Sequence, residues 1–321
     1  MIAGQDKAVE QFANAWAARR VHHAWLLAGP KGVGKARFAR EAANRLLAEA
    51  AGPAVDLPGL ETPADHPIAK LLAAGSHPDF RWIERVERPN GGLARNISVD
   101  QVRSLQDLLS VTPSMSPWRA IVIDSVDDLE ASAANALLKM LEEPPANTVF
   151  FLVSHAPGRL LPTIRSRCRR LDFPRLDDAV MTSLLSGSLT KETSAEIAQL
   201  VDFADGSIGR AFDIAALDLA PLESEAQAMM REGDSDNLRR SKLASALGTK
   251  GASDRYAAFL QLVPGLLARE AVRLEGDARR RALDAYEKAR HTVAVAPRLS
   301  LDPGATVFEL GGILASVALK R

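Results

Sequence analysis

The segment from residue 120 to residue 173 constrains the fold of this chain more than any other stretch. It opens with an apolar run that ends in Asp124, which is typical of a buried parallel strand with a carboxylate at its C-terminal tip. A helix is predicted next, because apolar residues recur at i, i+3, i+4 and i+7 and share one face. These residues are Ala134, Leu137, Leu138 and Leu141. Pro144 and Pro145 end this helix, because the residue before a proline is pushed out of the helical region.

A second strand and a basic turn follow in the same segment. An apolar run from Thr148 to Val153 ends at Ser154 and predicts another buried strand. After Pro162 the sequence reads Arg165-Ser166-Arg167-Cys168-Arg169-Arg170, and a third short strand is expected around Leu171. Strand, helix, strand, polar tip and basic turn together predict half of a nucleotide-binding α/β domain.

A glycine-rich segment near the N-terminus is predicted to be a phosphate-binding loop. An apolar strand at residues 22–28 leads into it, and a helix is expected to begin near Lys35. In such a loop the backbone N–H groups cradle phosphates and Lys35 reaches the β and γ phosphates, so ATP or ADP is the expected ligand. Ala36 replaces the serine or threonine that would ligate Mg²⁺, so the metal has lost one protein ligand and its binding stays open. The predicted cofactor-binding residues of the loop are Gly29, Pro30, Lys31, Gly32, Val33, Gly34, Lys35 and Ala36.

Length and composition fit a globular protein of two or three domains. The 321 residues are 47% hydrophobic and 25% charged, and the formal net charge is +0. Any DNA contact must therefore come from a local patch or from partner chains. The single cysteine, Cys168, excludes an internal disulfide and a cysteine-rich metal site. No apolar run of membrane-spanning length and no signal-peptide pattern is present, so a cytoplasmic location without membrane contact is expected.

The histidines do not indicate a metal site. His22 and His23 are adjacent, and neighbouring residues on a strand point to opposite faces. His66 and His77 each lie beside a proline in segments predicted as loops. No metal-binding residue is therefore predicted.

The chain beyond residue 174 is expected to be helical. Three short helices, separated by Gly- and Ser-containing breaks, are predicted at residues 179–185, 192–203 and 208–216. Longer helices are predicted at residues 223–232, 236–247, 253–274, 277–295 and 305–319. Pro264 is expected to kink or split the third of these, and Pro297 and Pro303 to mark the last loop.

Several sequence motifs resemble those of the clamp-loader AAA+ proteins. NALLKMLEEPP followed by an apolar strand and SRC carries this resemblance, and FFLVS…P…RLLPTIRSRC is most similar to the delta-prime family of bacterial DNA polymerase III. The resemblance implies an α/β AAA+ P-loop domain with a parallel sheet over residues 1–174. A small helical lid at 175–218 and an all-helical C-terminal collar domain at 219–321, which oligomerises with other subunits, are implied to follow.

At the positions that carry chemistry in this family, this chain has only some of the expected residue types. A working AAA+ ATPase needs Asp-Glu at the end of the central strand, so that the aspartate holds Mg²⁺ through water and the glutamate polarises the attacking water. Here the strand ends Asp124-Ser125, and serine is a poor general base. Ser154 falls at the sensor-1 position, where a polar side chain would contact the γ phosphate or the attacking water.

The lid motif departs from the family pattern as well. The position that is arginine in active relatives is Gly209, and the neighbouring Arg210 is rotated about the helix axis by about 100°. Together with Ala36 and Ser125, this departure predicts that the chain's own ATP hydrolysis is weak or absent.

The basic turn, in contrast, keeps the SRC motif intact around Arg167. The resemblance implies that this arginine reaches into the ATP site of a neighbouring subunit, where an arginine supplied in trans contributes about 10³–10⁵ in rate. Arg167 is therefore the predicted catalytic residue, acting in trans. The implied partners are the gamma/tau and delta subunits, with the sliding clamp and primer–template DNA reached through the assembly. Some relatives carry a four-cysteine zinc module. This chain has no cysteines at the corresponding place, so no zinc is expected.

The leading hypothesis is a stator subunit of the clamp loader, a component of the DNA polymerase III holoenzyme that supports ATP-dependent clamp loading in DNA replication. One alternative is an active gamma/tau-like ATPase that uses Lys35, Asp124 and Ser154, and ATP turnover by the isolated chain would favour it. The other is a scaffold that neither binds nucleotide nor lends an arginine.

Overall fold

The computed structural model describes residues 2–88 and 92–318. The chain divides into two compact units, one of Met1–Glu192 with Asp205–Arg210 and one of Thr193–Ala204 with Ala211–Arg321. The three-part division at residues 174/175 and 218/219 stays a prediction. The turn that the composition Pro-Asn-Gly-Gly predicts at residues 89–92 lies mostly outside the described residues.

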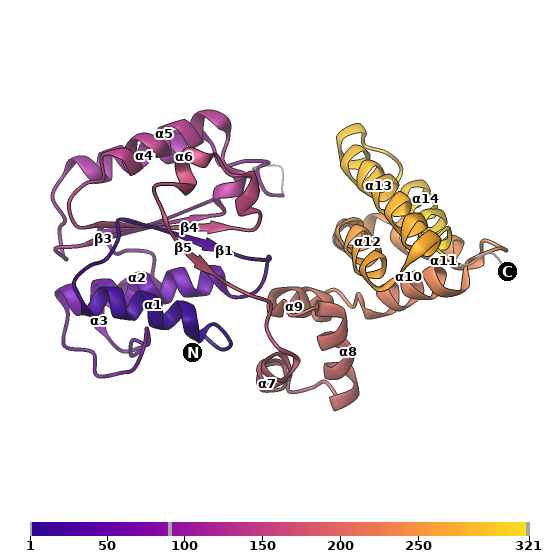
Figure 1. Cartoon of the computed structure of the whole chain (residues 1–321), viewed down its shortest axis with the longest axis horizontal. Coiled ribbons are helices and arrows are strands. Elements are labelled where there is room, and N and C mark those ends of the chain that lie inside the picture. The colour runs from indigo at the N-terminus through magenta and orange to yellow at the C-terminus, as the bar shows by residue number, and fades with distance from the viewer. Residues whose placement is uncertain (1, 89–91, 319–321) are drawn as a thin grey trace. The chain divides into compact units, whose positions relative to one another are not determined.

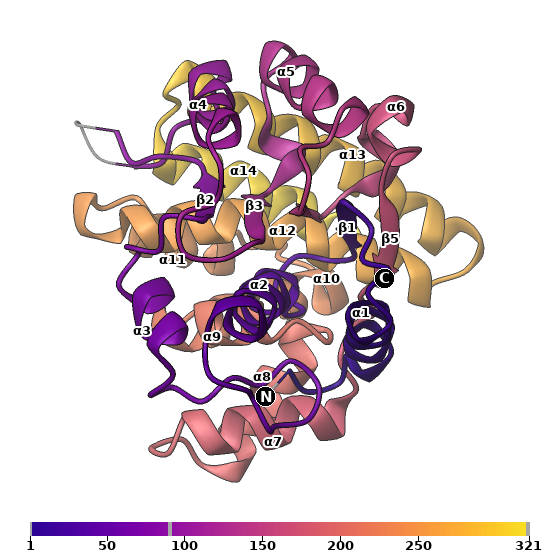
Figure 2. The ribbon, with the colours of Figure 1, turned by 90° about the vertical axis from the view of Figure 1, so that its left-hand side faces the viewer.

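A five-stranded parallel sheet forms the centre of the first unit, which confirms the predicted fold class. The strands are β1 (Ala24–Ala28), β2 (Phe80–Glu84), β3 (Arg119–Asp124), β4 (Thr148–Ser154) and β5 (Arg169–Asp172). Their order is β2-β3-β4-β1-β5, so β2 and β5 lie at the two edges (Figure 2). Because β1 and β4, and β3 and β4, are parallel neighbours, Gly29, Asp124 and Ser154 lie together at the C-terminal end of the strands.

Helices cover both faces of this sheet (Figure 1). One face carries α1 (Asp6–Ala17), α2 (Lys35–Ala51) and α3 (Pro67–Ala73), and the other carries α4 (Val99–Ser110), α5 (Ala131–Glu142) and α6 (Pro162–Arg165). Neighbouring residues of β4 supply both cores. Phe151 packs against Phe12 of α1, with ring centroids 5.4 Å apart, whereas Phe150 packs in the core under α4 and α5. The continuous apolar run of β4 is therefore explained by burial on both faces.

The predicted apolar face of α5 is partly correct. Leu137 and Leu141 are buried, whereas Ala134 and Leu138 are only partly buried. Ala133 and Met140 complete the buried face instead. A buried helix stripe is wider than a single i, i+3, i+4, i+7 set, so the spacing alone does not fix its centre.

The rest of the chain is helical, as predicted. Its helices are α7 (Asp178–Ser188), α8 (Ser194–Ala204), α9 (Ile208–Ala216), α10 (Ala220–Glu232), α11 (Leu238–Leu247), α12 (Ser253–Arg273), α13 (Gly276–Leu299) and α14 (Pro303–Ala315). The positions predicted for the prolines are partly wrong. α12 is not split at Pro264, because buried residues on both sides of the proline keep the helix packed, and Pro297 lies inside α13 rather than in the last loop. That helix ends two residues later, at Leu299, because the next residue, Ser300, has a φ of 51° and the Leu301 N–H donates to the Ala296 carbonyl.

A buried carboxylate fixes the chain just before β3. Asp79 is 1% exposed and accepts hydrogen bonds from the backbone N–H groups of Ser114, Met115 and Ser116 at 2.7, 2.8 and 3.0 Å. Its own carbonyl accepts from the N–H of Ala120. Burial alone would raise the pKa of Asp79, but the three backbone donors outweigh it and lower the pKa below its usual range. Asp79 therefore sets where β3 begins, and through β3 it sets the position of Asp124 along the strand direction.

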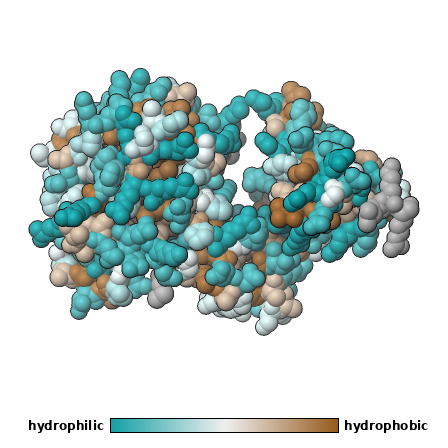
Figure 3. Space-filling model, viewed as in Figure 1, coloured by the Kyte–Doolittle hydropathy of each residue, from teal (hydrophilic) through white to brown (hydrophobic). Residues whose placement is uncertain are grey.

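The surface is mostly hydrophilic on the face shown in Figure 3, with hydrophobic residues in small patches. Among the described residues the most exposed large hydrophobic side chains are Val272, Leu299 and Leu238, all in the second unit. Within residues 2–88 and 92–318, no helix combines the length and the apolar character needed to cross a membrane.

Candidate functional site

The phosphate loop joins β1 to the first turn of α2. Gly32 and Gly34 have φ values of 79° and 100°, a backbone region that favours glycine. The backbone N–H groups of residues 32–36 have no acceptor within the described chain. Free donors at a helix N-terminus form a site for anions, so the loop fits the phosphates of a nucleotide.

Lys35 is buried at the base of this loop. Its Nζ donates to the carbonyl oxygen of Gly29 at 2.7 Å and also to that of Pro30. Burial lowers the pKa of Lys35 to about 8, although the carboxylates of Asp124 and Asp127 oppose the shift. The lysine is still mostly charged at neutral pH, and it lies where the loop closes on itself.

The tip of β3 has one carboxylate in the expected place and lacks the second. Burial, followed by the nearby carboxylate of Glu84, raises the pKa of Asp124, while Lys35 opposes this shift. Ser125 is 2% exposed, and its hydroxyl donates to Asp128 at 3.1 Å. Asp128 in turn lies 3.3 Å from Arg85. A serine bonded to this carboxylate has no capacity to act as a base near neutral pH.

Asp127 has a structural role that the sequence did not reveal. It accepts hydrogen bonds from the Ser154 hydroxyl at 2.9 Å, and from the backbone N–H groups of His155 and Ala156. These bonds tie the short helix after β3 to the tip of β4. The Ser154 hydroxyl and the Asp127 carboxylate are therefore hydrogen-bonded to each other.

His155 was missed by the sequence reasoning, although its place directly after Ser154 is a signal for it. Burial, together with the charge of Lys35, lowers the pKa of His155 to about 4, so the ring is neutral at physiological pH. Its Nδ1 is buried and has no hydrogen-bond partner in the described chain. A neutral ring beside the phosphate loop leaves Lys35 and Lys31 as the cations that act there.

The segment at residues 207–210 lies directly on the tip of the phosphate loop. The Ser207 hydroxyl donates to the Lys31 carbonyl at 2.9 Å, and the Gly209 N–H donates to the Gly32 carbonyl at 2.9 Å. A Cβ atom at position 209 would lie 2.9 Å from the Cα of Gly32. Gly209 thus has a structural role of its own, because the contact between the two backbones needs a residue without a side chain.

We expect Gly209→Ala to destabilise the first unit by about 1–3 kcal/mol, because backbone must move to relieve the clash with Gly32. Thermal unfolding monitored by calorimetry would measure the loss. Gly187→Ala is the matched control, since an added Cβ in this part of α7 meets nothing within 4 Å. Equal melting temperatures for the two variants would contradict the importance of the contact.

Arg167 precedes β5 and has two contacts within its own chain. Its Nη2 lies 2.8 Å from Oε1 of Glu142, and its Nη1 donates to the Thr163 carbonyl at 3.0 Å. The neighbouring Cys168 is largely buried, which raises the pKa of its thiol to about 12 and makes it unreactive. Arg169 lies over the ring of Trp25, at 5.0 Å from the ring centroid.

The basic turn and the phosphate loop lie at opposite ends of neighbouring strands. In the parallel pair of β1 and β5, Trp25 aligns with Arg169 and Ala28 aligns with Asp172. Arg167 comes before the start of β5, whereas the phosphate loop begins after the end of β1. At about 3.3 Å per residue, at least about 10 Å of strand separates the two. Arg167 therefore does not belong to the nucleotide site of its own chain.

The paired histidines differ from the sequence prediction. His22 and His23 lie before β1 rather than on it, and their rings stack at 4.3 Å with an interplanar angle of 30°. The expectation that they point to opposite faces was therefore wrong, because strand alternation does not apply outside the strand. Within the described residues, no group of three or more His, Cys, Asp or Glu side chains is arranged to hold a metal ion.

Comparison with known proteins places this arrangement in one family. The model of the family described as DNA polymerase III, delta subunit, matches residues 4–177, which is more than half of the chain. The chain belongs to this family. The match begins just before α1 and ends at residue 177, beyond the end of β5. It therefore spans all of the α/β part of the first unit.

Similar proteins carry the names of DNA polymerase III subunits. The DNA polymerase III subunit delta' of Pseudomonas aeruginosa is 36% identical over 190 residues, which cover 58% of this chain and 53% of that protein. The subunit tau of Bacillus subtilis is 30% identical over 273 residues, which cover 82% of this chain and 45% of that protein. The chain thus spans about half the length of these relatives.

A solved structure also matches along most of the chain. It is a gamma subunit-related protein of DNA polymerase III from Thermotoga maritima, with 18% identity and a TM-score of 0.46 over 96% of this chain and 98% of that chain.

Proposed function

We propose that the chain acts as the delta-prime stator of a DNA polymerase III clamp loader and supplies Arg167 to the ATP site of a neighbouring subunit. One observation carries this proposal: Arg167 is one-third exposed and lies at the far end of the strands from its own phosphate loop. An arginine so placed can serve a nucleotide only on another chain. The partners would be the gamma/tau and delta subunits, and the assembly would load the sliding clamp at primer–template DNA. The deciding experiment is removal of the Arg167 side chain in the assembled complex.

The chain's own nucleotide site is proposed to bind ATP or ADP without hydrolysing ATP. The free N–H groups of residues 32–36 and the charge of Lys35 would hold the phosphates of ATP or ADP. A bound nucleotide would supply phosphates to this cradle, and Asp124 would be the remaining carboxylate for a hydrated Mg²⁺. Ser125 cannot act as a base, and the 207–210 segment brings a glycine to the loop where the family pattern has an arginine.

We expect the isolated chain to bind ADP while showing no ATP turnover above background. Lys35→Ala should weaken ADP binding by about 10-fold or more, because a hydrogen bond to a charged group contributes about 1.5–3 kcal/mol. Titration with a fluorescent ADP analogue would measure the affinity. Lys70→Ala, on the exposed side of α3, is the matched control and should bind like the wild type. Binding unaffected by Lys35→Ala would support the scaffold alternative instead.

A gamma/tau-like motor is the second candidate, and two observations favour it. Lys35 and Asp124 are retained in their expected places, and the relatives named tau and gamma match at 30–32% identity. Sustained ATP turnover by the isolated chain would establish this alternative and reject the stator.

A further inference from the structure

The guanidinium of Arg167 is held in a defined orientation by its own chain. The ion pair with Glu142 and the hydrogen bond to the Thr163 carbonyl engage its two terminal nitrogens. Because the guanidinium is planar with fixed donor directions, two such contacts fix both where it lies and how it is turned. A phosphate of another subunit would have to compete for these same donors.

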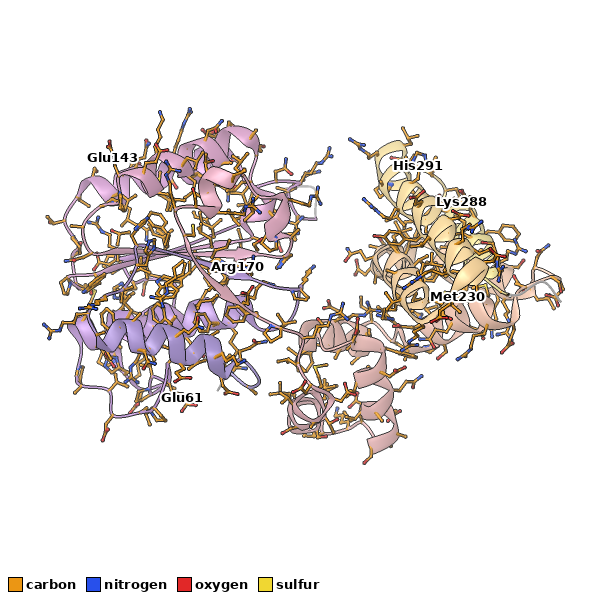
Figure 4. The ribbon with its side chains drawn as sticks, viewed as in Figure 1. Glu61, Glu143, Arg170, Met230, Lys288 and His291 are labelled. Carbon is orange, nitrogen blue, oxygen red and sulfur yellow. The ribbon has the colours of Figure 1, made fainter. Side chains whose placement is uncertain are left out.

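Glu142 occupies an unfavourable place for a carboxylate. It is the last residue of α5, at the helix end where the dipole is negative. The next residue, Glu143, carries the same charge and is exposed, and Figure 4 shows it on the helical layer above the sheet. Among the described residues the Glu143 side chain has no ion pair or hydrogen bond. Of these two neighbouring carboxylates, only Glu142 meets the arginine.

We propose that Glu142 is a positioning residue that holds Arg167 in an ion-paired orientation, called here the parked state. The phosphates of a neighbouring subunit's nucleotide compete with Glu142 for the guanidinium and release it from this state. This inference rests on the proposed role of Arg167 in trans. The side chains of Arg167 and Glu142 are 34% and 48% exposed, so a phosphate can reach the guanidinium without any unfolding of this chain. An exposed ion pair is also weak enough to exchange readily.

The parked state lowers the apparent affinity of the neighbouring site for ATP, because only the released fraction of Arg167 can bind. Glu142→Gln should therefore lower both the KM for ATP of the reconstituted complex and its Kd for ATPγS by about 1.5- to 5-fold, the range expected for loss of an exposed ion pair. The kcat should change less, because saturating nucleotide already draws the arginine away. Added salt should reduce the difference between variant and wild type, since it screens the ion pair.

Two further variants separate this inference from the proposed function. Glu143→Gln removes the same charge one residue away and should leave KM and Kd unchanged. In the background of Arg167→Ala, Glu142→Gln should have no effect, because the two residues act through one contact.

The outcomes are distinguishable. If Arg167→Ala leaves ATP turnover of the complex intact, the proposed function fails, and this inference with it. If Arg167→Ala abolishes turnover at the site but Glu142→Gln behaves like Glu143→Gln, the parked state alone is rejected. A fall in kcat for Glu142→Gln would also reject it, because the carboxylate would then be orienting the arginine for catalysis rather than withholding it.

Discussion

Replacing Arg167 with alanine should lower ATP turnover at the neighbouring subunit's site by about 10³–10⁵-fold, the usual contribution of an arginine that stabilises charge on a transferring phosphoryl group in trans. Single-turnover hydrolysis in a complex reconstituted with gamma/tau and delta subunits would measure it, because steady-state rates also include the other sites. The isolated chain should keep its affinity for ADP, since Arg167 lies at the other end of the strands from its own phosphate loop.

Arg165→Ala is the matched control for this prediction. Arg165 lies two residues away on α6 and is exposed. Removing it changes the charge of the basic turn by the same amount. Equal effects of the two variants would indicate a general electrostatic contribution of the turn, and the specific role of Arg167 would be wrong.

Replacing Asp79 with alanine should destabilise the first unit by about 3 kcal/mol or more. Three buried backbone donors, those of Ser114, Met115 and Ser116, would lose their acceptor, and each unsatisfied group costs about 1–3 kcal/mol before water relieves part of it. At about 2–4 °C per kcal/mol for a unit of this size, the melting temperature should fall by roughly 6–12 °C. Asp107→Ala on α4 removes an exposed carboxylate and should have little effect.

The stabilisation by Asp79 should also depend on pH in a defined direction. Its pKa is lower in the folded chain than in the unfolded one, so the unfolded state binds the proton more readily. The contribution is therefore fully present above the unfolded pKa of about 3.9, and it is lost as the pH falls through the folded value. The stability difference between wild type and Asp79→Ala should shrink with acidification over this range. A constant difference would show that the carboxylate charge is not what holds the loop.

Local pattern was enough to predict the elements that carry the site. α2 begins at Lys35 because Gly34, with a φ of 100°, is still left-handed and the chain enters the right-handed helical region only after it. The apolar runs of β3 and β4 end at Asp124 and Ser154 as expected. Each of these features is decided within about ten residues of sequence, by burial on both faces of a parallel sheet and by turn residues.

The contacts that define how the site works depend on residues far apart in the sequence. Asp127 meets Ser154 across 27 positions, and Gly209 meets Gly32 across a still longer separation. No spacing rule predicts such pairs, because they follow from how the strands and helices pack. The continuation of α13 through Pro297 has the same origin, since local propensity argued for a loop there.

The contact between Gly209 and Gly32 makes an arginine at position 209 difficult to acquire by a single substitution. A site that has lost one functional side chain can ordinarily regain it by a single codon change. Here an arginine returning at position 209 would bring its Cβ against the backbone of the phosphate loop before its guanidinium could reach any nucleotide. The two backbones would have to separate first, at the expense of the hydrogen bonds that now join them. A single substitution of Gly209 by arginine is thus disfavoured by the close approach of the two backbones.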